Sequence, residues 1–240
     1  MEQPANSSKS NFIRDKRVEQ EVAKFLDKSL YKSVLFTEIE RVSDKERQKL
    51  GIDVFISSPS LDLDKSPVDE KSQSSLLYLN SSLPTFVLEL SALNTDNEEV
   101  IGWFLNQSNK TEYYLFVWLD KTRKKEDLIE EDIDEISYCI VSYETLLSYF
   151  EKYSLSIEEL KIRNSEIREK YKDCEEKKTI YNDKYGNEFH YCYSGQLHEK
   201  SINIVIKKRV LFDLSILNGK ISRDWKARVF HIYKNFSKML

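Results

Sequence analysis

Two apolar segments, residues 85–93 (TFVLELSAL) and 111–119 (TEYYLFVWL), constrain the fold of this chain more than any other feature. Both are rich in aromatic and β-branched residues, as strands buried inside a sheet usually are. Residues 136–143, 188–194 and 202–208 have the same character and are also predicted to be strands. The chain is therefore expected to build a central β-sheet.

Helical patterns flank these strands. Apolar residues recur at helical spacing over residues 15–32, which predicts an amphipathic helix before the first strand. Residues 144–153 and 156–171 continue as helical patterns, and residues 222–240 read as a basic amphipathic helix that closes the chain. The expected fold class is α/β, with a mixed central sheet flanked by helices. Residues 1–14 are polar and are expected to form a flexible lead-in.

The composition excludes several classes of protein. With only 5 glycines and neither a GxGxxG nor a GxxxxGK motif, the chain lacks the loops that cradle nucleotide phosphates. Its 3 cysteines are far apart and form no CxxC pair, so we expect a reducing, cytoplasmic setting rather than a disulfide framework. No apolar run reaches membrane-spanning length, and we expect no membrane partner.

Charged residues occur where two further strands are predicted, at residues 51–57 and 67–73. Asp53 lies in the first of these segments, and Asp69 lies in the second. If the two strands pair as a hairpin, the two carboxylates can converge. Two carboxylates with a neighbouring carbonyl form a hard-oxygen site of the kind that suits Mg²⁺.

The alternation of side chains along 67–73 decides which residues join Asp53. Asp69, Lys71 and Gln73 share one face of a strand, and Glu70 takes the other. A lysine beside a metal site can orient an attacking water and offset charge that develops on a phosphate. Because Asp69 and Glu70 are adjacent acids, a register in which Glu70 faces the site stays open, and Lys71 would then point away.

At these residues the chain resembles the PD-(D/E)xK nuclease superfamily, which includes restriction endonucleases and Holliday-junction resolvases. Asp53 matches the first acid of the family motif, Asp69 the second and Lys71 the lysine, and Gln73 stands where a polar residue often follows. Gly51 and Ile52 precede Asp53 where the family often has proline.

The resemblance extends to the first predicted helix. Its EQEVAKFL segment is similar to the helix that carries a glutamate in resolvase-type members, which points to Glu19 as the helical acid, with Glu21 as the competitor. The resemblance implies a restriction-endonuclease-like core over residues 15–125, with residues 126–240 as a C-terminal α+β extension packed on it in one compact domain.

The activity implied is hydrolysis of phosphodiester bonds in DNA, less readily RNA, with Mg²⁺ or Mn²⁺ as cofactor. The family further implies metal ligands at Asp53, Asp69 and Glu19, catalytic support from Lys71 and Gln73, and a homodimer that cuts both strands. Phage defence or a mobile element is a natural setting for such small nucleases.

Two oppositely charged regions suggest partners. Residues 201–240 carry nine basic residues against two acidic ones, so this region is expected to contact the nucleic-acid backbone. The residues predicted to do so are Lys226, Arg228, Lys234 and Lys238. Residues 126–135 carry seven acidic residues and no basic one, which favours a protein partner or a surface that mimics DNA.

Simpler interpretations stay open at this stage. Asp53, Asp69 and Lys71 can be the solvated face of a surface hairpin, or the fold can serve as a catalytically inactive adaptor for nucleic acid or protein. The histidines and cysteine of residues 190–198 match no zinc spacing. Glu89, within an apolar segment, is a possible neighbour of the site on the adjacent strand.

Overall fold

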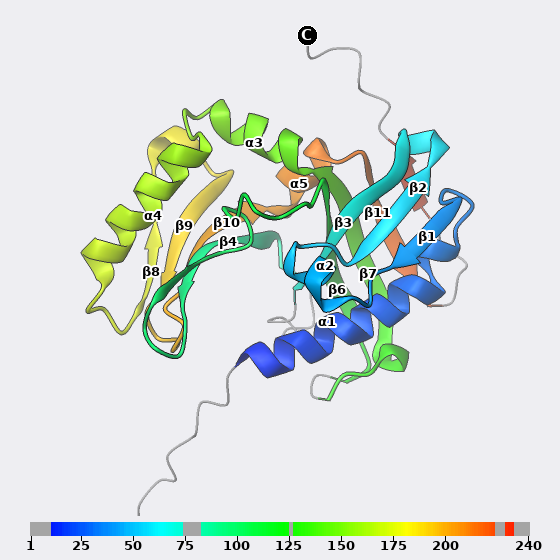
Figure 1. The fold of residues 1–240 in the computed structure, drawn as a ribbon, viewed down its shortest axis with the longest axis horizontal. Helices are drawn as coiled ribbons and strands as arrows, with labels where there is room; N and C mark the ends of the chain where they lie inside the picture. Colours follow the sequence, from blue (N-terminus) through cyan, green and yellow to red (C-terminus); the bar gives the residue numbers. More distant parts are fainter. Residues whose placement is uncertain (1–10, 74–82, 125–126, 224–228, 233–240) are drawn as a thin grey trace, which may run out of the picture.

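The computed structural model describes residues 11–73, 83–124, 127–223 and 229–232. Within this part of the chain, two β-sheets and five α-helices form a mixed α/β fold (Figure 1). The mixed α/β class expected from the sequence is confirmed, but the strands form two sheets rather than one central sheet. None of the described helices has the length and apolar character that crossing a lipid bilayer requires.

The first sheet has seven described strands in the order β1-β2-β3-β6-β7-β11-β12. Only β3 and β6 run parallel; every other neighbouring pair is antiparallel. The strands are β1 (Glu38–Arg41), β2 (Val54–Ser58), β3 (Leu63–Gln73), β6 (Tyr113–Thr122), β7 (Ile133–Ser142), β11 (Leu217–Ser222) and β12 (Val229–Ile232).

The second sheet is antiparallel and has the order β5-β4-β10-β9-β8. Its strands are β4 (Thr85–Leu93), β5 (Glu99–Ile101), β8 (Lys177–Ile180), β9 (Phe189–Ser194) and β10 (Ile202–Lys207). Parallel strands cannot be joined by a tight turn, and β4 and β5 lie in the connection from β3 to β6. The helices are α1 (Asn11–Lys28), α2 (Lys45–Lys49), α3 (Tyr143–Glu151), α4 (Ile157–Tyr171) and α5 (Lys208–Leu214).

The alternation of side chains in β6 explains why the first sheet is covered on both faces. Leu115 and Val117 point to the face that α1 covers, where they pack with the buried stripe of that helix, including Val22 and Phe25. Alternate residues of the same strand, such as Trp118, point to the opposite face and belong to a second cluster. Near-continuous apolar runs therefore identify strands buried on both faces.

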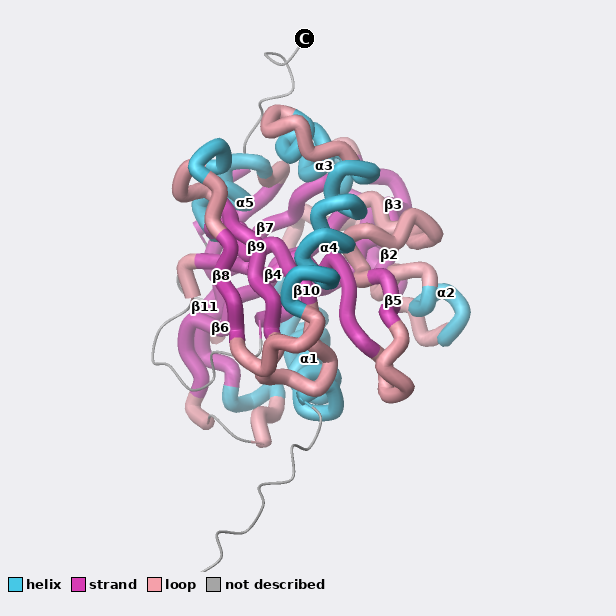
Figure 2. Tube along the Cα trace, turned by 90° about the vertical axis from the view of Figure 1, so that its left-hand side faces the viewer, coloured by secondary structure: helices cyan, strands magenta, loops and turns pink. Residues whose placement is uncertain are grey.

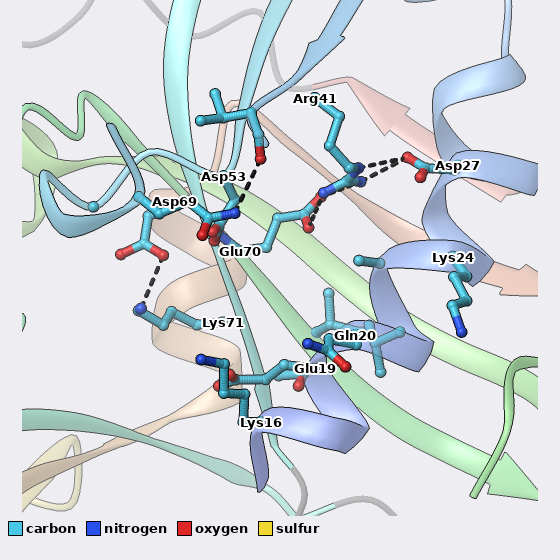
Figure 3. Close-up of a pocket in the computed structure, with 17 residues that line it drawn as sticks. Lys16, Glu19, Gln20, Lys24, Asp27, Arg41, Asp53, Asp69, Glu70 and Lys71 are labelled. Carbon is cyan, nitrogen blue, oxygen red and sulfur yellow. Dashed lines mark hydrogen bonds and ion pairs between the residues drawn. The ribbon is translucent and has the colours of Figure 1, made fainter. Parts of the chain in front are cut away.

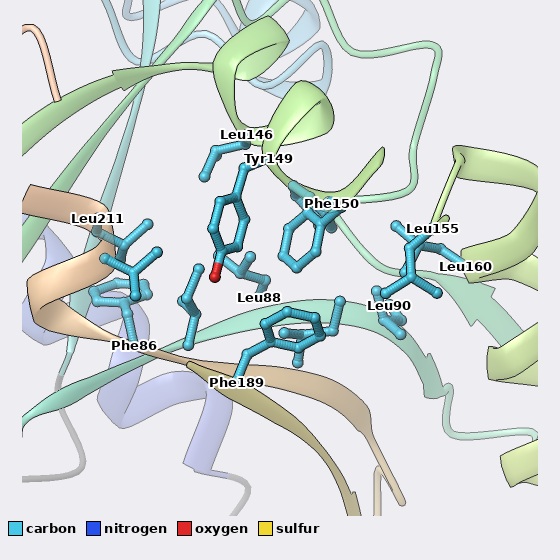
Figure 4. Packing of buried hydrophobic residues seen from close by; sticks show 14 of the residues in the cluster. Phe86, Leu88, Leu90, Leu146, Tyr149, Phe150, Leu155, Leu160, Phe189 and Leu211 are labelled. Atoms are coloured by element: carbon cyan, nitrogen blue, oxygen red, sulfur yellow. The ribbon is translucent and has the colours of Figure 1, made fainter. Parts of the chain in front are cut away.

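The second cluster joins the two sheets and three helices. Phe86 on β4 packs against Phe116 on β6, with ring centroids 4.7 Å apart, and Trp118 donates its indole N–H to the Thr85 carbonyl at 2.8 Å. Figure 4 shows side chains from β4, α3, α4, β9 and α5 meeting in this cluster. Seen from the side, α4 lies against the second sheet (Figure 2).

Both sheets take strands from either side of residue 125. One expectation about the secondary structure needs correction. The closing helix expected over 222–240 is wrong for residues 229–232, which form β12 and pair with β11. These residues, Val-Phe-His-Ile, suit a strand, and β11 offers them an edge to pair with. Residues 172–188 contain the short strand β8, which pairs with β9.

Candidate active site

The first sheet has a notch at the start of β2, where residues 69–73 of β3 have no partner strand on the β2 side among the described strands. The β2–β3 ladder starts at the Val54–Val68 pair, and β3 then continues to Gln73 beside β6 alone among the described strands. Asp53, directly before β2, bridges the gap. Its backbone N–H donates to the Val68 carbonyl at 2.9 Å, and its carboxylate Oδ2 accepts the Glu70 backbone N–H at 2.8 Å. The Asp53 side chain thus takes the position of the next ladder partner, opposite Asp69.

β3 places its polar side chains as the alternation predicts. Asp69, Lys71 and Gln73 lie opposite alternate β6 residues whose side chains belong to the cluster between the sheets. Glu70 lies opposite Leu115, whose side chain faces α1. The structure therefore brings Asp53, Asp69 and Lys71 together and turns Glu70 to the other side.

Glu70 is fully engaged on that side. Its carboxylate accepts hydrogen bonds from the Tyr31 hydroxyl at 2.6 Å and from Arg41 at 2.7 and 3.1 Å. Arg41 also donates to Asp27 on α1 at 2.6 and 3.0 Å. This network ties α1, β1 and β3 together, so Glu70 has a structural task and the alternative register does not occur.

Asp69 is the buried carboxylate of the site, with 2% of its surface exposed. Oδ1 lies 2.8 Å from Lys71 Nζ, whereas Oδ2 is buried without a hydrogen-bond partner. Burial raises the pKa of Asp69 to about 8, because a charged carboxylate is poorly solvated there. The nearby Asp53 carboxylate raises this pKa further, and Lys71 opposes the change.

Lys71 stays charged in this setting. Burial alone would lower the pKa of its ammonium, but the carboxylates of Asp69, Asp53 and Glu19 outweigh burial and raise that pKa. The ammonium also lies 5.2 Å from the centroid of the Trp103 ring. Lys71 is therefore a fixed positive charge rather than a proton acceptor.

The helical acid that reaches this region is Glu19. Its side chain is exposed, yet the pKa of its carboxyl is raised, mainly because the surrounding protein removes part of its solvation. Lys71 opposes this change, and the negative charge of Asp53 adds to it. Glu21 faces elsewhere: its carboxylate accepts the Glu130 backbone N–H at 2.9 Å and pairs with Lys24. Of the two glutamates considered from the sequence, Glu19 is thus the one at the pocket.

These residues line an open pocket of about 520 Å³ between α1 and the notch (Figure 3). Its walls carry acidic and basic side chains in nearly equal numbers. The charged lining residues are Lys16, Glu19, Lys24, Asp27, Arg41, Asp53, Asp69, Glu70 and Lys71. The pocket is therefore polar, and its one unpartnered buried carboxylate oxygen belongs to Asp69.

The side chains of the pocket could hold a metal ion only through two carboxylates, those of Asp53 and Asp69. Within the described residues, no three His, Cys, Asp or Glu side chains are grouped so that they could hold a metal. Asp53 and Asp69 nevertheless offer hard oxygens, and Asp69 Oδ2 lacks any other partner. Mg²⁺ is commonly held by one or two carboxylates, with waters and substrate oxygens completing its shell. Glu19, the third ligand that the resemblance implies, does not form such a group with Asp53 and Asp69 in the described part of the chain.

Other residues singled out from the sequence have clear positions. Gln73 is buried, and neither its amide nitrogen nor its amide oxygen has a hydrogen-bond partner. Glu89 was expected on a strand adjacent to β3, and this expectation is wrong. Glu89 lies on β4, in the second sheet. Burial raises the pKa of Glu89, and Lys71 is near enough to oppose that change. His190 and His198 belong to no metal-holding group in the described chain.

The regions expected to bind partners give little support to that role. Lys226, Arg228, Lys234 and Lys238 lie outside the described residues. The acidic stretch 126–135 is partly internal, because Glu130 is 2% exposed and pairs with Lys28 and Arg223. Its charges serve the fold at least in part.

Sequence reasoning missed Trp103, Arg41 and the turn that holds Asp53. Gly51, with φ of +73°, opens that turn, and its carbonyl accepts the Thr111 hydroxyl at 2.6 Å. A glycine two residues before a candidate ligand was the available signal for the turn. No local pattern marks Trp103, because its contact with Lys71 depends on the packing of the two sheets.

Comparisons of the chain with protein-family models, curated proteins and solved structures found no match.

Proposed function

We propose that the protein is a Mg²⁺-dependent nuclease of the PD-(D/E)xK type that hydrolyses phosphodiester bonds in DNA. The observation that carries this proposal is the buried Asp69 oxygen without a partner, next to Asp53 and Lys71. A carboxylate held in this state destabilises the fold unless a cation or a proton joins it, so its presence points to a binding site.

The order of the elements supports the same proposal. A helix with Glu19 is followed by β1, by Asp53 at the head of β2, and by Asp69-x-Lys71 on β3. This order matches the family pattern to which the sequence is similar. The restriction-endonuclease-like core is part of the proposal, with the first sheet and α1 as its body and the second sheet as an addition.

Each residue has a task that follows from its position. Asp53 and Asp69 would hold the metal, which supplies a Lewis acid for the phosphate and an acidified water. Lys71 contributes a fixed positive charge to the developing negative charge of the phosphoryl group. Glu19 lies where it can accept a hydrogen bond from a water in the pocket, and Gln73 has free amide groups on the same face of β3.

Cleavage assays test the proposal directly. Purified protein is incubated with plasmid, linear single-stranded DNA and RNA, with Mg²⁺, Mn²⁺ or EDTA. We expect metal-dependent cutting of DNA, with the rate reduced by at least about 10²-fold in Asp69→Asn and Lys71→Met, as for other removed charge-stabilising groups. Rates in both variants equal to that of the parent protein would refute the site.

Two matched variants on α1 sharpen the test. Glu19→Gln removes the acid that lines the pocket, whereas Glu21→Gln removes the acid that faces Glu130 and keeps an oxygen to accept that N–H. We expect only the first to slow cleavage. If the parent protein cuts no nucleic acid yet binds DNA or a protein tightly, the non-catalytic adaptor replaces the nuclease. Sedimentation with and without DNA tests the homodimer expected for cutting both strands.

A further inference from the structure

Lys71 is held by more than its ion pair with Asp69. We propose that Trp103, from the loop after β5, is a positioning residue for Lys71. This inference rests on the proposed nuclease function for its catalytic meaning, but the placement of Lys71 is testable without it.

The geometry around the ammonium carries the proposal. Nζ of Lys71 lies 2.8 Å from Asp69 Oδ1 and 5.2 Å from the centroid of the Trp103 ring. A lysine side chain has a flexible four-carbon stem, so one hydrogen bond to its ammonium does not fix its position. An indole face attracts a cation and blocks the positions beyond it. The two contacts together confine the ammonium to the side of the pocket where Asp69 lies.

A glycine explains how Trp103 reaches this position. A Cβ on Gly102 would lie 2.4 Å from the Glu89 carbonyl oxygen, so only glycine allows the loop to pass so close to β4. The Gly102 backbone N–H donates to the Leu90 carbonyl at 2.8 Å, and that of Phe104 donates to the Glu89 carbonyl at 3.1 Å. The chain is thereby folded back on β4, with Trp103 between the two anchors.

The indole ring is itself supported. Its centroid lies 5.0 Å from that of the Tyr114 ring and 6.0 Å from that of the Phe104 ring. The backbone carbonyl of Trp103 accepts the Asn109 side-chain N–H at 3.3 Å. Tyr114 is the residue of β6 opposite Asp69. Trp103 therefore rests on the strand pair that carries the site, and the connection between β3 and β6 supplies one wall of it.

Kinetics of three variants test the role in catalysis. Trp103→Leu removes the ring, Trp103→Phe keeps an aromatic face, and Tyr143→Leu is the matched control. The Tyr143 ring packs on those of Phe104 and Tyr114 in the same aromatic cluster. We expect kcat to fall about 10- to 100-fold in Trp103→Leu with little change in KM, because small misplacements of a reacting group cost that much. Trp103→Phe should restore most of kcat, and Tyr143→Leu should keep it. Equal losses in Trp103→Leu and Tyr143→Leu would overturn the proposal.

Nuclear magnetic resonance of protein with ¹³C-labelled lysine provides a readout that does not need cleavage. The ε-methylene protons of Lys71, assigned by their loss in Lys71→Met, should be shifted upfield by the Trp103 ring. The shift should disappear in Trp103→Leu and persist in Tyr143→Leu. An unshifted Lys71 signal in the parent protein would overturn the placement, whether or not the protein is a nuclease. A shifted signal in a protein that cuts nothing would support the placement and count against the nuclease.

Discussion

Replacing Asp69 by asparagine should make the metal-free protein more stable at alkaline pH while it removes function. Asparagine has the shape of the protonated acid, keeps a carbonyl oxygen for the Lys71 ammonium, and cannot ionise. The parent carboxylate is 2% exposed, and one of its oxygens has no hydrogen-bond partner. Ionising it inside the fold therefore costs free energy that the variant avoids.

The size and sign of the effect follow from the pKa of Asp69. This pKa is raised from 3.8 to about 8 in the folded protein, mainly by burial. Below about pH 4 the carboxyl is protonated in both states and contributes no penalty. Between pH 4 and 8 only the unfolded state loses the proton, so the stability of the parent falls by up to about 1.4 kcal/mol per pH unit. Above pH 8 the penalty is complete, with an upper value of roughly 6 kcal/mol.

Urea unfolding in EDTA, at half-unit steps from pH 4.5 to 9, measures this difference. The free energy of unfolding of Asp69→Asn should exceed that of the parent by at least about 2 kcal/mol at pH 8, and the gap should shrink toward zero at pH 4.5. Asp64→Asn, at an exposed aspartate of the same strand, is the matched control and should show no such pH-dependent gain.

Two results would refute the reasoning. One is an Asp69→Asn variant no more stable than the parent at pH 8. The other is a difference of the same size at pH 4.5 and pH 8, which would trace the effect to packing rather than to ionisation.

Three further outcomes are expected. Arg41→Met should lower the free energy of unfolding by on the order of 2 kcal/mol, since it leaves the Glu70 carboxylate without its main partner; urea denaturation measures it. Gly51→Ala should destabilise the protein by about 1–3 kcal/mol, because φ is +73° and the added Cβ would lie 2.6 Å from a threonine hydroxyl; a lowered Tm with reduced cleavage would show both effects. In a thiol titration of the native protein Cys174 should react first, and the two buried cysteines only after unfolding; fast reaction of three thiols would contradict the buried positions.

The sequence predicted those parts of the fold whose cause is local. The apolar run of β6 and the helical stripe of α1 each bury a face that can be read from periodicity. The common face of Asp69 and Lys71 followed from the period of two along a strand. The strand β12 was missed because its state depends on the free edge of β11, a partner distant in the sequence. The basic sequence around it suggested an amphipathic helix instead.

In the site, too, contacts between paired strands could be predicted, whereas contacts that depend on packing between distant parts of the chain could not. Asp53 directly precedes β2, and Asp69 and Lys71 lie on β3, its partner strand, so their meeting could be anticipated from a hairpin. Glu89 on β4 and Trp103 in the loop after β5 approach Lys71 from the side of the second sheet, which packs on the first through Phe86. No spacing in the sequence encodes that approach, because it depends on how two sheets stack.

Two adjacent acids on β3 provide the strongest physical reason to locate the chemistry at this notch. Glu70 is half-buried, and its two carboxylate oxygens accept hydrogen bonds from Tyr31 and Arg41, so both of them have partners within the fold. Asp69 is buried more deeply, yet Lys71 contacts one of its oxygens only and the other has no hydrogen-bond partner. If both acids served only the fold, position 69 would be better filled by asparagine, which avoids the cost of ionisation. A residue that weakens the folded state, beside a second carboxylate and a fixed ammonium, is best explained by a ligand that it binds.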